Sequence, residues 1–156
     1  MLTVGQKVPS FSLQNQDGEM VSLSQFKGKN LILYFYPKDD TPGCTREAIG
    51  FGALAMSFKA HNAVVLGVSR DTVVSHKKFC DKHKLEIPLL SDDSGQVTED
   101  YGVWQEKKQY GRTYMGIVRT TYWIGPDGLV QKIWENVKVA EHPEAVFFAL
   151  LDNKGA

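Results

Sequence analysis

Short apolar runs separated by amphipathic stretches organise this chain of 156 residues. Four runs predict strands, because they are apolar or aromatic and end at turn-forming residues: NLILYFYP (30–37), AVVLGVS (63–69), IPLLSD (87–92) and GIVRTTYWIGPDGLVQKIWE (116–135). The last run contains Gly and Pro at 125–128, so it predicts two strands joined by a turn. Residues 11–29 predict an N-terminal β-hairpin that turns around the Asp-Gly pair within 15–19.

Three other stretches have helical spacing. In residues 42–60 the apolar side chains recur every three or four positions: Ala48, Phe51, Ala55 and Phe58. Residues 71–84 predict a second helix, with Asp71 as its N-cap. Residues 142–152 predict a closing helix with Pro143 near its start.

The order of these elements predicts an α/β fold. Strands that alternate with helices form a parallel portion of sheet with right-handed crossovers, and the late strand pair adds antiparallel strands. The expected architecture is a mixed central sheet flanked by helices, which resembles the thioredoxin-like fold. No repeat or linker divides the sequence, so we expect one domain over residues 1–156.

The charge balance argues against several classes of partner. Lys plus Arg equals Asp plus Glu at 18 each, which gives no basic surface for nucleic acid. The apolar runs are too short to cross a membrane. The N-terminus MLTVGQKVPSF does not have the basic start and apolar stretch of a signal peptide, so we expect a cytoplasmic protein.

The chain has only two cysteines, Cys44 and Cys80. In a reducing compartment such a pair is more often catalytic, redox-sensing or metal-binding than structural. The only plausible ligand group on one helix face is His76, Cys80 and His83, which has no fourth member. We therefore expect no metal.

Cys44 follows a predicted strand and opens a predicted helix. Thr41 suits the N-cap and Pro42 suits the first helical position, so Cys44 falls in the first turn. Unpaired backbone N–H groups and the positive end of the helix dipole favour a thiolate there. The alternative is a loop cysteine that only fills space.

The residues around Cys44 resemble a known signature. Pro37-x-x-x-Thr41-x-x-Cys44 is similar to the active-site motif of the peroxiredoxins, and YPKDDTPGCTREA (36–48) resembles their Q subfamily, the bacterioferritin comigratory proteins. Other matching segments extend the resemblance over nearly the whole chain: LTVGQKVPSFSLQNQDG, LGVSRD and YGRTYMGIVRTTYWIGPDG.

The resemblance implies roles for five residues. Cys44 becomes the peroxidatic cysteine, which attacks a peroxide oxygen and turns into a sulfenic acid. The Thr41 hydroxyl and the backbone N–H groups of Gly43 and Cys44 bind the substrate and stabilise the developing charge. Pro37 shields the pocket from water, and Arg119 completes the site.

Two residues have open alternatives: Arg119, and Glu47, which stands in the Thr-x-Glu position of the family. An arginine inside an apolar strand is costly unless it is paired, which favours a site role for Arg119 over a strand-edge position facing solvent. Glu47 either orients the arginine or is an exposed helix glutamate.

The resemblance also implies a resolving cysteine. Many members carry it five residues after the first cysteine, where this chain has Ile49; Cys80, 36 residues after Cys44, fits the family's second arrangement. An intramolecular Cys44–Cys80 disulfide is then expected, with Lys77 and Lys84 helping to ionise Cys80. The alternative is a half-buried cysteine that acts as a small hydrophobe.

A bond between two helices requires one of them to move. Gly50 and Gly52 lie early in the first predicted helix and each weaken it by about 1 kcal/mol relative to alanine, so we expect them to permit local unwinding. The alternative is that they allow close helix packing.

The sequence thus predicts a thiol peroxidase for hydrogen peroxide and organic hydroperoxides, recycled by thioredoxin or a similar dithiol reductant, with no cofactor. Because both cysteines lie in one chain, a monomer suffices. Two rivals remain: a dithiol–disulfide oxidoreductase, against which the absence of Cys-x-x-Cys counts, and a non-enzymatic redox sensor or chaperone.

Overall fold

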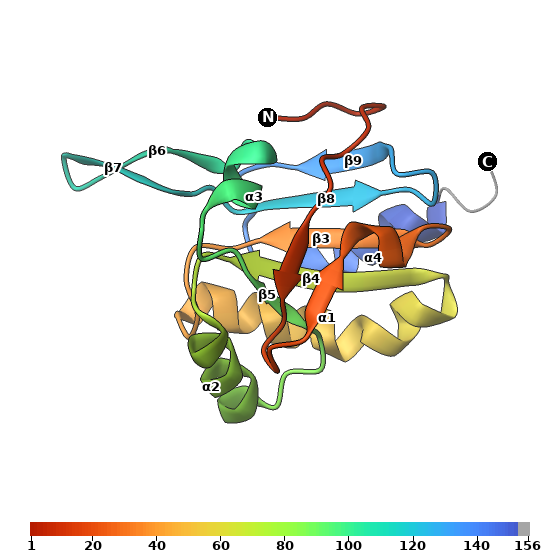
Figure 1. The fold of residues 1–156 in the computed structure, drawn as a ribbon, viewed down its shortest axis with the longest axis horizontal. Coiled ribbons are helices and arrows are strands. Elements are labelled where there is room, and N and C mark those ends of the chain that lie inside the picture. The colour runs from red at the N-terminus through yellow and green to blue at the C-terminus, as the bar shows by residue number, and fades with distance from the viewer. Residues whose placement is uncertain (153–156) are drawn as a thin grey trace.

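A computed structural model describes residues 1–152, which contain one seven-stranded sheet and a separate two-stranded ribbon. The sheet has the order β2–β1–β5–β4–β3–β8–β9 (Figure 1). Its strands are, in chain order, β1 (Ser12–Gln14), β2 (Met20–Ser22), β3 (Asn30–Phe35), β4 (Ala63–Ser69), β5 (Leu89–Ser91), β8 (Thr120–Ile124) and β9 (Val130–Trp134).

The predicted helices are present. They are α1 (Pro42–Ala60), α2 (Val73–His83) and α4 (His142–Asp152), and the short 3-10 helix η1 (Leu23–Phe26) follows the N-terminal hairpin. No helix in the described residues is long and apolar enough to cross a membrane.

The centre of the sheet explains why the apolar runs are so continuous. β3, β4 and β5 pair in parallel, whereas β8 runs antiparallel to β3 and β9 antiparallel to β8. Helices connect the parallel strands, so β3 and β4 are buried on both faces and need apolar side chains on both. The predicted mixed sheet with flanking helices is confirmed.

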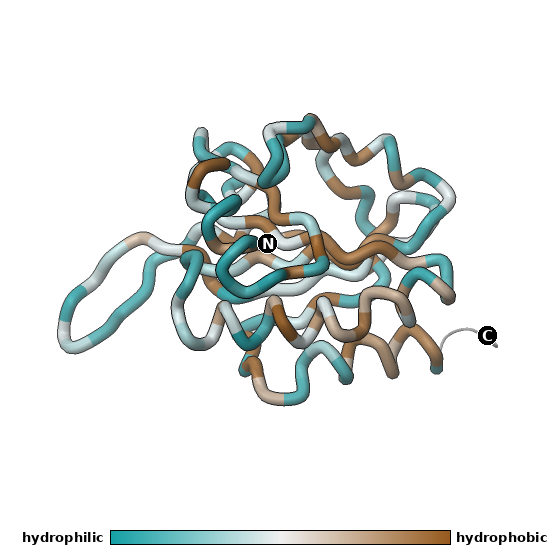
Figure 2. The backbone as a smooth tube through the Cα atoms, turned by 90° about the horizontal axis from the view of Figure 1, so that it is seen from below, coloured by the Kyte–Doolittle hydropathy of each residue, from teal (hydrophilic) through white to brown (hydrophobic). Residues whose placement is uncertain are grey.

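Alternate residues of β3 enter two different apolar clusters. Leu31, Leu33 and Phe35 belong to a cluster with the N-terminal segment and β8. Ile32, Tyr34 and the following Tyr36 belong to a second cluster, in which they meet side chains of α1, α2 and α4. In Figure 1 α1 and α2 lie together below the sheet, and Figure 2 shows the apolar strands running through the middle of the molecule. Both cysteines belong to this second cluster.

Some predicted boundaries were wrong. β3 ends at Phe35, before Pro37, and β5 covers only Leu89–Ser91. α2 is capped by Thr72, whose side chain accepts a hydrogen bond from the Ser75 backbone N–H; Asp71 is not the cap. The carboxylate of Asp71 instead accepts hydrogen bonds from the Asp39 backbone and the Ser69 hydroxyl.

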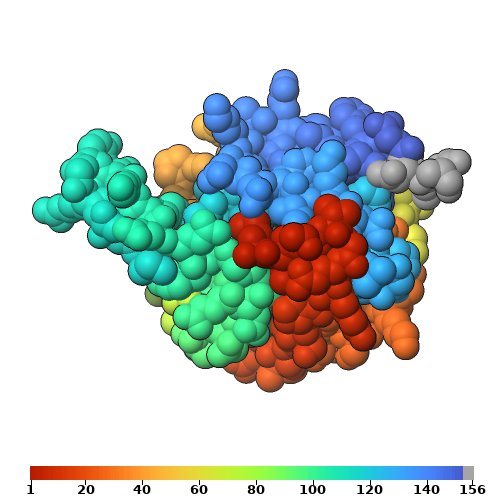
Figure 3. Space-filling view, turned by 90° about the horizontal axis from the view of Figure 1, so that it is seen from above, coloured from red at the N-terminus to blue at the C-terminus, as the bar shows by residue number. Residues whose placement is uncertain are grey.

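The two-stranded ribbon was not predicted. β6 (Trp104–Gln109) and β7 (Arg112–Ile117) form a hairpin that projects from the body, as Figures 1 and 3 show. Most of its side chains are exposed, so neither strand has a buried face that would create an apolar alternation. At its base the Arg70 guanidinium lies 3.4 Å from the centre of the Trp104 ring. The short helix α3 (Gln96–Asp100), which precedes the ribbon, was also missed.

The two glycines of α1 have different surroundings. A Cβ atom on Gly50 would lie 2.8 Å from Cγ of Pro143, at the start of α4, which is closer than a real contact. Gly50 therefore allows close packing of α1 on α4, the alternative left open by the sequence. A Cβ on Gly52 would meet only ordinary contacts with Glu86, the nearest at 3.5 Å.

Candidate active site

Cys44 lies in the first turn of α1 and its side chain is almost wholly buried, with 2% of the residue exposed. The loop after β3 reaches this turn through Thr41, whose extended backbone places it at the N-cap, and Pro42 begins the helix as predicted. The Thr41 hydroxyl accepts no capping hydrogen bond from the helix, and it donates a hydrogen bond to the Lys38 carbonyl at 2.9 Å. Backbone N–H groups at the start of α1 therefore stay available beside the thiol.

Arg119 connects Cys44 to a carboxylate. One guanidinium nitrogen, Nη2, lies 3.2 Å from Cys44 Sγ, and the other, Nη1, donates to Glu47 Oε1 at 2.5 Å. The planar guanidinium group thus donates to two acceptors, the Cys44 sulfur and the Glu47 carboxylate, which lie on the same face of α1. Arg119 lies in the connection between β7 and β8, not inside a strand as predicted. It reaches inward from there, so it does not face solvent as the alternative required.

Glu47 is fully buried, so the reading of it as an exposed helix residue was wrong. It stands three residues after Cys44 and four before Phe51, which places it on the buried stripe of α1. Burial raises the pKa of the Glu47 carboxyl to about 7, although the Arg119 charge and hydrogen bond act to lower it. Its second oxygen, Oε2, has no hydrogen-bond partner among the described residues.

Gly43 faces the same arginine. A Cβ atom at this position would lie 3.3 Å from Arg119 Nη2, so a larger residue would press on the guanidinium. Pro37 is half-buried in the loop that follows β3. The structure therefore brings Cys44, Gly43, Glu47 and Arg119 together, with Thr41 one turn away and Pro37 in the same loop.

Comparisons with known proteins agree with this arrangement. Residues 4–133 match the model of the AhpC/TSA family. A putative peroxiredoxin bcp of Coxiella burnetii is 48% identical over 90% of this chain and 93% of its own length. The chain belongs to the peroxiredoxins of the AhpC/TSA family. Peroxiredoxins are peroxidases, so the chain is an enzyme.

Solved peroxiredoxin structures share the fold. A cysteine-to-serine mutant of PrxQ from Xylella fastidiosa superposes with a TM-score of 0.93 at 36% identity, covering 97% of both chains. A bacterioferritin comigratory protein of Xanthomonas campestris, described with its alkyl peroxide reduction activity, gives a TM-score of 0.86 at 41% identity over 91% of this chain and 90% of its own. Serine mutants of the Xanthomonas protein have been solved for two cysteines that stand 36 positions apart. The thioredoxin-like peroxiredoxin fold is confirmed.

Cys80, the second thiol of this peroxiredoxin, is also buried. It lies on α2 with 7% of the residue exposed, and both cysteines are free thiols. Burial, followed by the charges of Asp39, Asp81 and Asp17, raises the pKa of the Cys80 thiol to about 11.

Lys77 acts on Cys80 in the predicted direction, but the two lysines do not offset the burial and the carboxylate charges that raise its pKa. The Lys77 charge is the smallest of the causes that shift the pKa of Cys80, and its ammonium group is paired with Asp17 at 3.2 Å and Asp81 at 3.4 Å. Lys84 follows the last turn of α2 in a left-handed conformation, with φ at 51°, and its side chain is exposed. The thiol is therefore protonated while α2 is folded.

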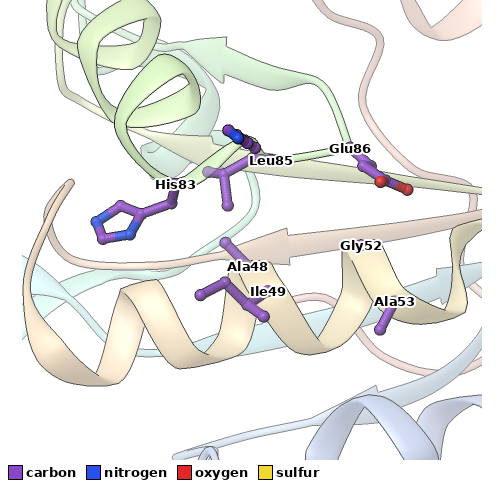
Figure 4. Close-up of a pocket in the computed structure, with 8 residues that line it drawn as sticks. Ala48, Ile49, Gly52, Ala53, His83, Leu85 and Glu86 are labelled. Atoms are coloured by element: carbon purple, nitrogen blue, oxygen red, sulfur yellow. The ribbon is translucent and has the colours of Figure 1, made fainter.

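A small groove separates α1 from the chain after α2 (Figure 4). Ala48, Ile49, Gly52 and Ala53 line it from α1, and residues 83–86 line it from the other side. Ile49 is half-exposed here. The volume of about 210 Å³ is below the 300–1,000 Å³ or so typical of ligand pockets, so the groove does not indicate a bound cofactor.

One group of side chains in the described residues has the composition of a metal site: Asp39, Asp71 and His76. Both ring nitrogens of His76 already have partners, since Nδ1 lies 2.7 Å from Asp39 Oδ2 and Nε2 lies 2.9 Å from the Leu90 carbonyl. Asp71 accepts two hydrogen bonds. We therefore interpret the group as a hydrogen-bond network. His83, the third member of the helix-face group considered from sequence, pairs with Asp40 instead.

Lys107 is a residue near the site that sequence reasoning missed. Its ammonium group, on β6, donates to the Ile117 carbonyl at 2.9 Å, two residues before Arg119. Burial and the Arg119 charge lower the pKa of Lys107, and the nearby Cys44 acts to raise it. Lys107 and Arg119 line the same open depression at the base of the ribbon. A lysine in a polar, exposed hairpin gives no sequence signal of this placement.

Proposed function

We propose that this peroxiredoxin reduces hydrogen peroxide and alkyl hydroperoxides through a sulfenic acid on Cys44. The observation that carries the proposal is the Arg119 guanidinium at 3.2 Å from Cys44 Sγ, which stabilises a thiolate and places a cation where charge develops on the peroxide. The alkyl peroxide activity described for the Xanthomonas relative supports this substrate class.

The first step forms one bond and breaks one. The Cys44 thiolate attacks the terminal peroxide oxygen, an S–O bond forms, and the O–O bond breaks. The leaving oxygen takes up one proton, the equivalent of the one that the Cys44 thiol released on ionisation, and departs as water or alcohol, while Cys44 becomes the sulfenic acid. Thr41, which is half-buried at the N-cap of α1, would orient the peroxide together with the N–H groups of Gly43 and Cys44, and Pro37 would limit the entry of water.

The second step makes an intramolecular disulfide. The Cys80 thiol attacks the sulfenic sulfur, water leaves, and the Cys44–Cys80 bond forms. Thioredoxin or a similar dithiol protein then reduces the disulfide by exchange. The 36-residue spacing of the two cysteines replaced in the Xanthomonas relative, the same as here, supports Cys80 as the resolving residue. Because both cysteines belong to one chain, we propose a monomer, active in the reducing cytoplasm.

Peroxide turnover with thioredoxin and its reductase tests the proposal. Cys44→Ser should abolish turnover, whereas Cys80→Ser should keep one rapid oxidation and lose thioredoxin-linked cycling. Stopped-flow oxidation of the wild type no faster than that of free cysteine would overturn the peroxidase assignment and leave the two rivals. Unchanged cycling in Cys80→Ser would instead assign resolution to an external thiol.

A further inference from the structure

Two consecutive carboxylates, Asp39 and Asp40, connect the loop before Cys44 to helix α2. Asp39 contacts residues in the first turn of α2, and Asp40 contacts residues in its last turn. Cys80 lies between these two points of contact. No step of the proposed peroxidase reaction uses either carboxylate.

The inner contact is buried. The carboxylate of Asp39 accepts hydrogen bonds from the Tyr36 hydroxyl at 2.6 Å and the Ser75 hydroxyl at 2.7 Å, and it lies 2.7 Å from His76 Nδ1. His76 is fully buried, and its Nε2 lies 2.9 Å from the Leu90 carbonyl, so both ring nitrogens have partners. The Tyr36 and Ser75 hydroxyls both donate to the Asp39 carboxylate, and hydrogen bonds to a carboxylate are stronger than those between neutral groups.

The outer contact is exposed. Asp40 lies 2.7 Å from Lys82 Nζ through one oxygen and 2.9 Å from His83 Nε2 through the other. Its backbone is left-handed, with φ at 56°, a conformation that Asp and Asn tolerate better than other non-glycine residues. This conformation lets neighbouring carboxylates reach opposite ends of the same helix.

We propose that Asp39 and Asp40 are positioning residues for the thiol-exchange step, a clamp that holds α2 folded around Cys80. The proposal rests on the Cys44–Cys80 disulfide proposed above. Cys80 is buried and protonated in the clamped helix, so it reacts only after α2 loosens. The clamp thus sets the lifetime of the Cys44 sulfenic acid. A longer lifetime lets a second peroxide oxidise it to sulfinic acid more often.

The same clamp connects the two helices that carry the thiols. Its carboxylates lie in the loop that leads directly into the first turn of α1, only four and five residues before Cys44. When Cys44 leaves its turn this loop shifts, and both contacts with α2 weaken together. Release of Cys80 is thereby linked to the departure of Cys44 from Arg119.

The experiment compares two rates in each variant, disulfide formation and overoxidation, by quenched-flow mass spectrometry over a peroxide series. Asp40→Asn keeps a residue that tolerates the left-handed backbone, and Lys82→Met removes one of the two partners of Asp40 from the helix side. Lys78→Met is the matched control, because it removes a lysine one turn earlier on α2 that makes no ion pair among the described residues. Asp39→Asn tests the buried contact.

We expect the ratio of disulfide formation to overoxidation to rise by about two- to fivefold in Asp40→Asn and Lys82→Met, as befits an exposed ion pair. Asp39→Asn should raise it by about tenfold or more, because a buried charge-assisted contact is lost. Lys78→Met should keep the wild-type ratio. A merely structural role would lower thermal stability without moving this ratio.

An unchanged ratio in both Asp40→Asn and Lys82→Met would overturn the clamp. Should Asp39→Asn fail to fold, these two exposed variants still decide the question. If the wild type forms no Cys44–Cys80 disulfide, the proposed function fails first. Amide hydrogen exchange of residues 73–83 then tests the clamp alone. The exchange rate should increase in Asp40→Asn, and equal rates in the variant and the wild type would exclude the clamp.

Discussion

Arg119 holds Glu47 and the thiol of Cys44 with the two ends of one guanidinium group, at 2.5 Å and 3.2 Å. A lysine offers one charged centre and could not serve both acceptors in this geometry. The fixed orientation of the arginine therefore depends on Glu47. The charge environment of the Cys44 thiol depends on Glu47 indirectly, through the arginine.

Replacing Arg119 should slow the peroxide step. In Arg119→Ala the thiolate and the transition state both lose a donor, and we expect a loss of roughly 10²–10³-fold in the second-order rate constant. Arg119→Lys should recover only part of this loss. Stopped-flow tryptophan fluorescence during reaction with hydrogen peroxide measures both; a wild-type rate in Arg119→Ala would show that the arginine has no part in the reaction.

Removing the charge at Lys107 should have a smaller effect. Lys107→Met loses the hydrogen bond to the Ile117 carbonyl and one cation near Cys44, so the peroxide rate should fall by less than in Arg119→Ala, by about three- to tenfold on the scale of one hydrogen bond. Lys108→Met, on the neighbouring exposed position of the ribbon, is the control. Equal rates in the two variants would contradict a role for Lys107.

Glu47 should make stability fall as pH rises. Its pKa in the folded protein is about 7, above the usual value of 4.5, so the fold binds the proton more tightly than the unfolded chain. The stabilisation is complete below about pH 4.5 and is lost as pH rises through 7, with a total on the order of 3 kcal/mol.

Urea denaturation of the reduced protein between pH 4.5 and 8 checks this dependence against Glu47→Gln, which keeps an oxygen for Arg119 but cannot ionise. The wild type should lose stability relative to the variant across this range. Parallel curves for the two proteins would show that Glu47 does not titrate there.

Cys80 should resist alkylation in the folded, reduced protein. A pKa of about 11 in place of 9.0 reduces the thiolate fraction at pH 8 by about 100-fold, and burial slows the reaction further. Mass spectrometry after iodoacetamide treatment should find Cys80 modified slowly in native protein and rapidly in urea. Lys77→Met should leave this rate nearly unchanged, and a large drop would restore Lys77 as an activator.

The two glycines of α1 should respond differently to alanine. Gly50→Ala brings its Cβ against Pro143 and should destabilise the fold by about 1–3 kcal/mol. The Cβ of Gly52→Ala has room, so this variant should stabilise the helix by about 1 kcal/mol.

If α1 unwinds during disulfide formation, Gly52→Ala should slow that step and increase overoxidation to sulfinic acid. Mass spectrometry across a peroxide series measures both, with hydrogen exchange of residues 42–55 alongside. Identical sulfinic acid yields in Gly52→Ala and wild type would remove this glycine from the mechanism.

The elements that the sequence predicted well are those whose burial forces a pattern. β3 and β4 are buried on two faces, which requires continuous apolar runs. Thr41-Pro42-Gly43 has the composition of a helix start, so the order of residues is enough to place Cys44 in a first turn. The burial of Glu47 could also have been read from its position on the stripe that contains Cys44 and Phe51.

Other features of the structure could not be predicted, because no neighbouring residues in the sequence indicate them. The β6–β7 ribbon stands in solvent and needs no apolar alternation. The contact between Asp39 and His76 joins residues 37 positions apart, and the raised pKa of Cys80 depends on burial that three carboxylates reinforce. Lysines adjacent in sequence suggested the opposite charge environment, because spacing along a helix does not show which ammonium groups are already paired.

Both thiols of the reduced enzyme are packed into one apolar cluster with Tyr34, Phe51 and Phe79. The proposed disulfide between them would take Cys44 away from Arg119 and disturb this packing, so the oxidised protein would lose contacts that the reduced protein has. Such a difference would raise the reduction potential of the disulfide. The folded core of the reduced state would then favour the reduction of the disulfide by a dithiol.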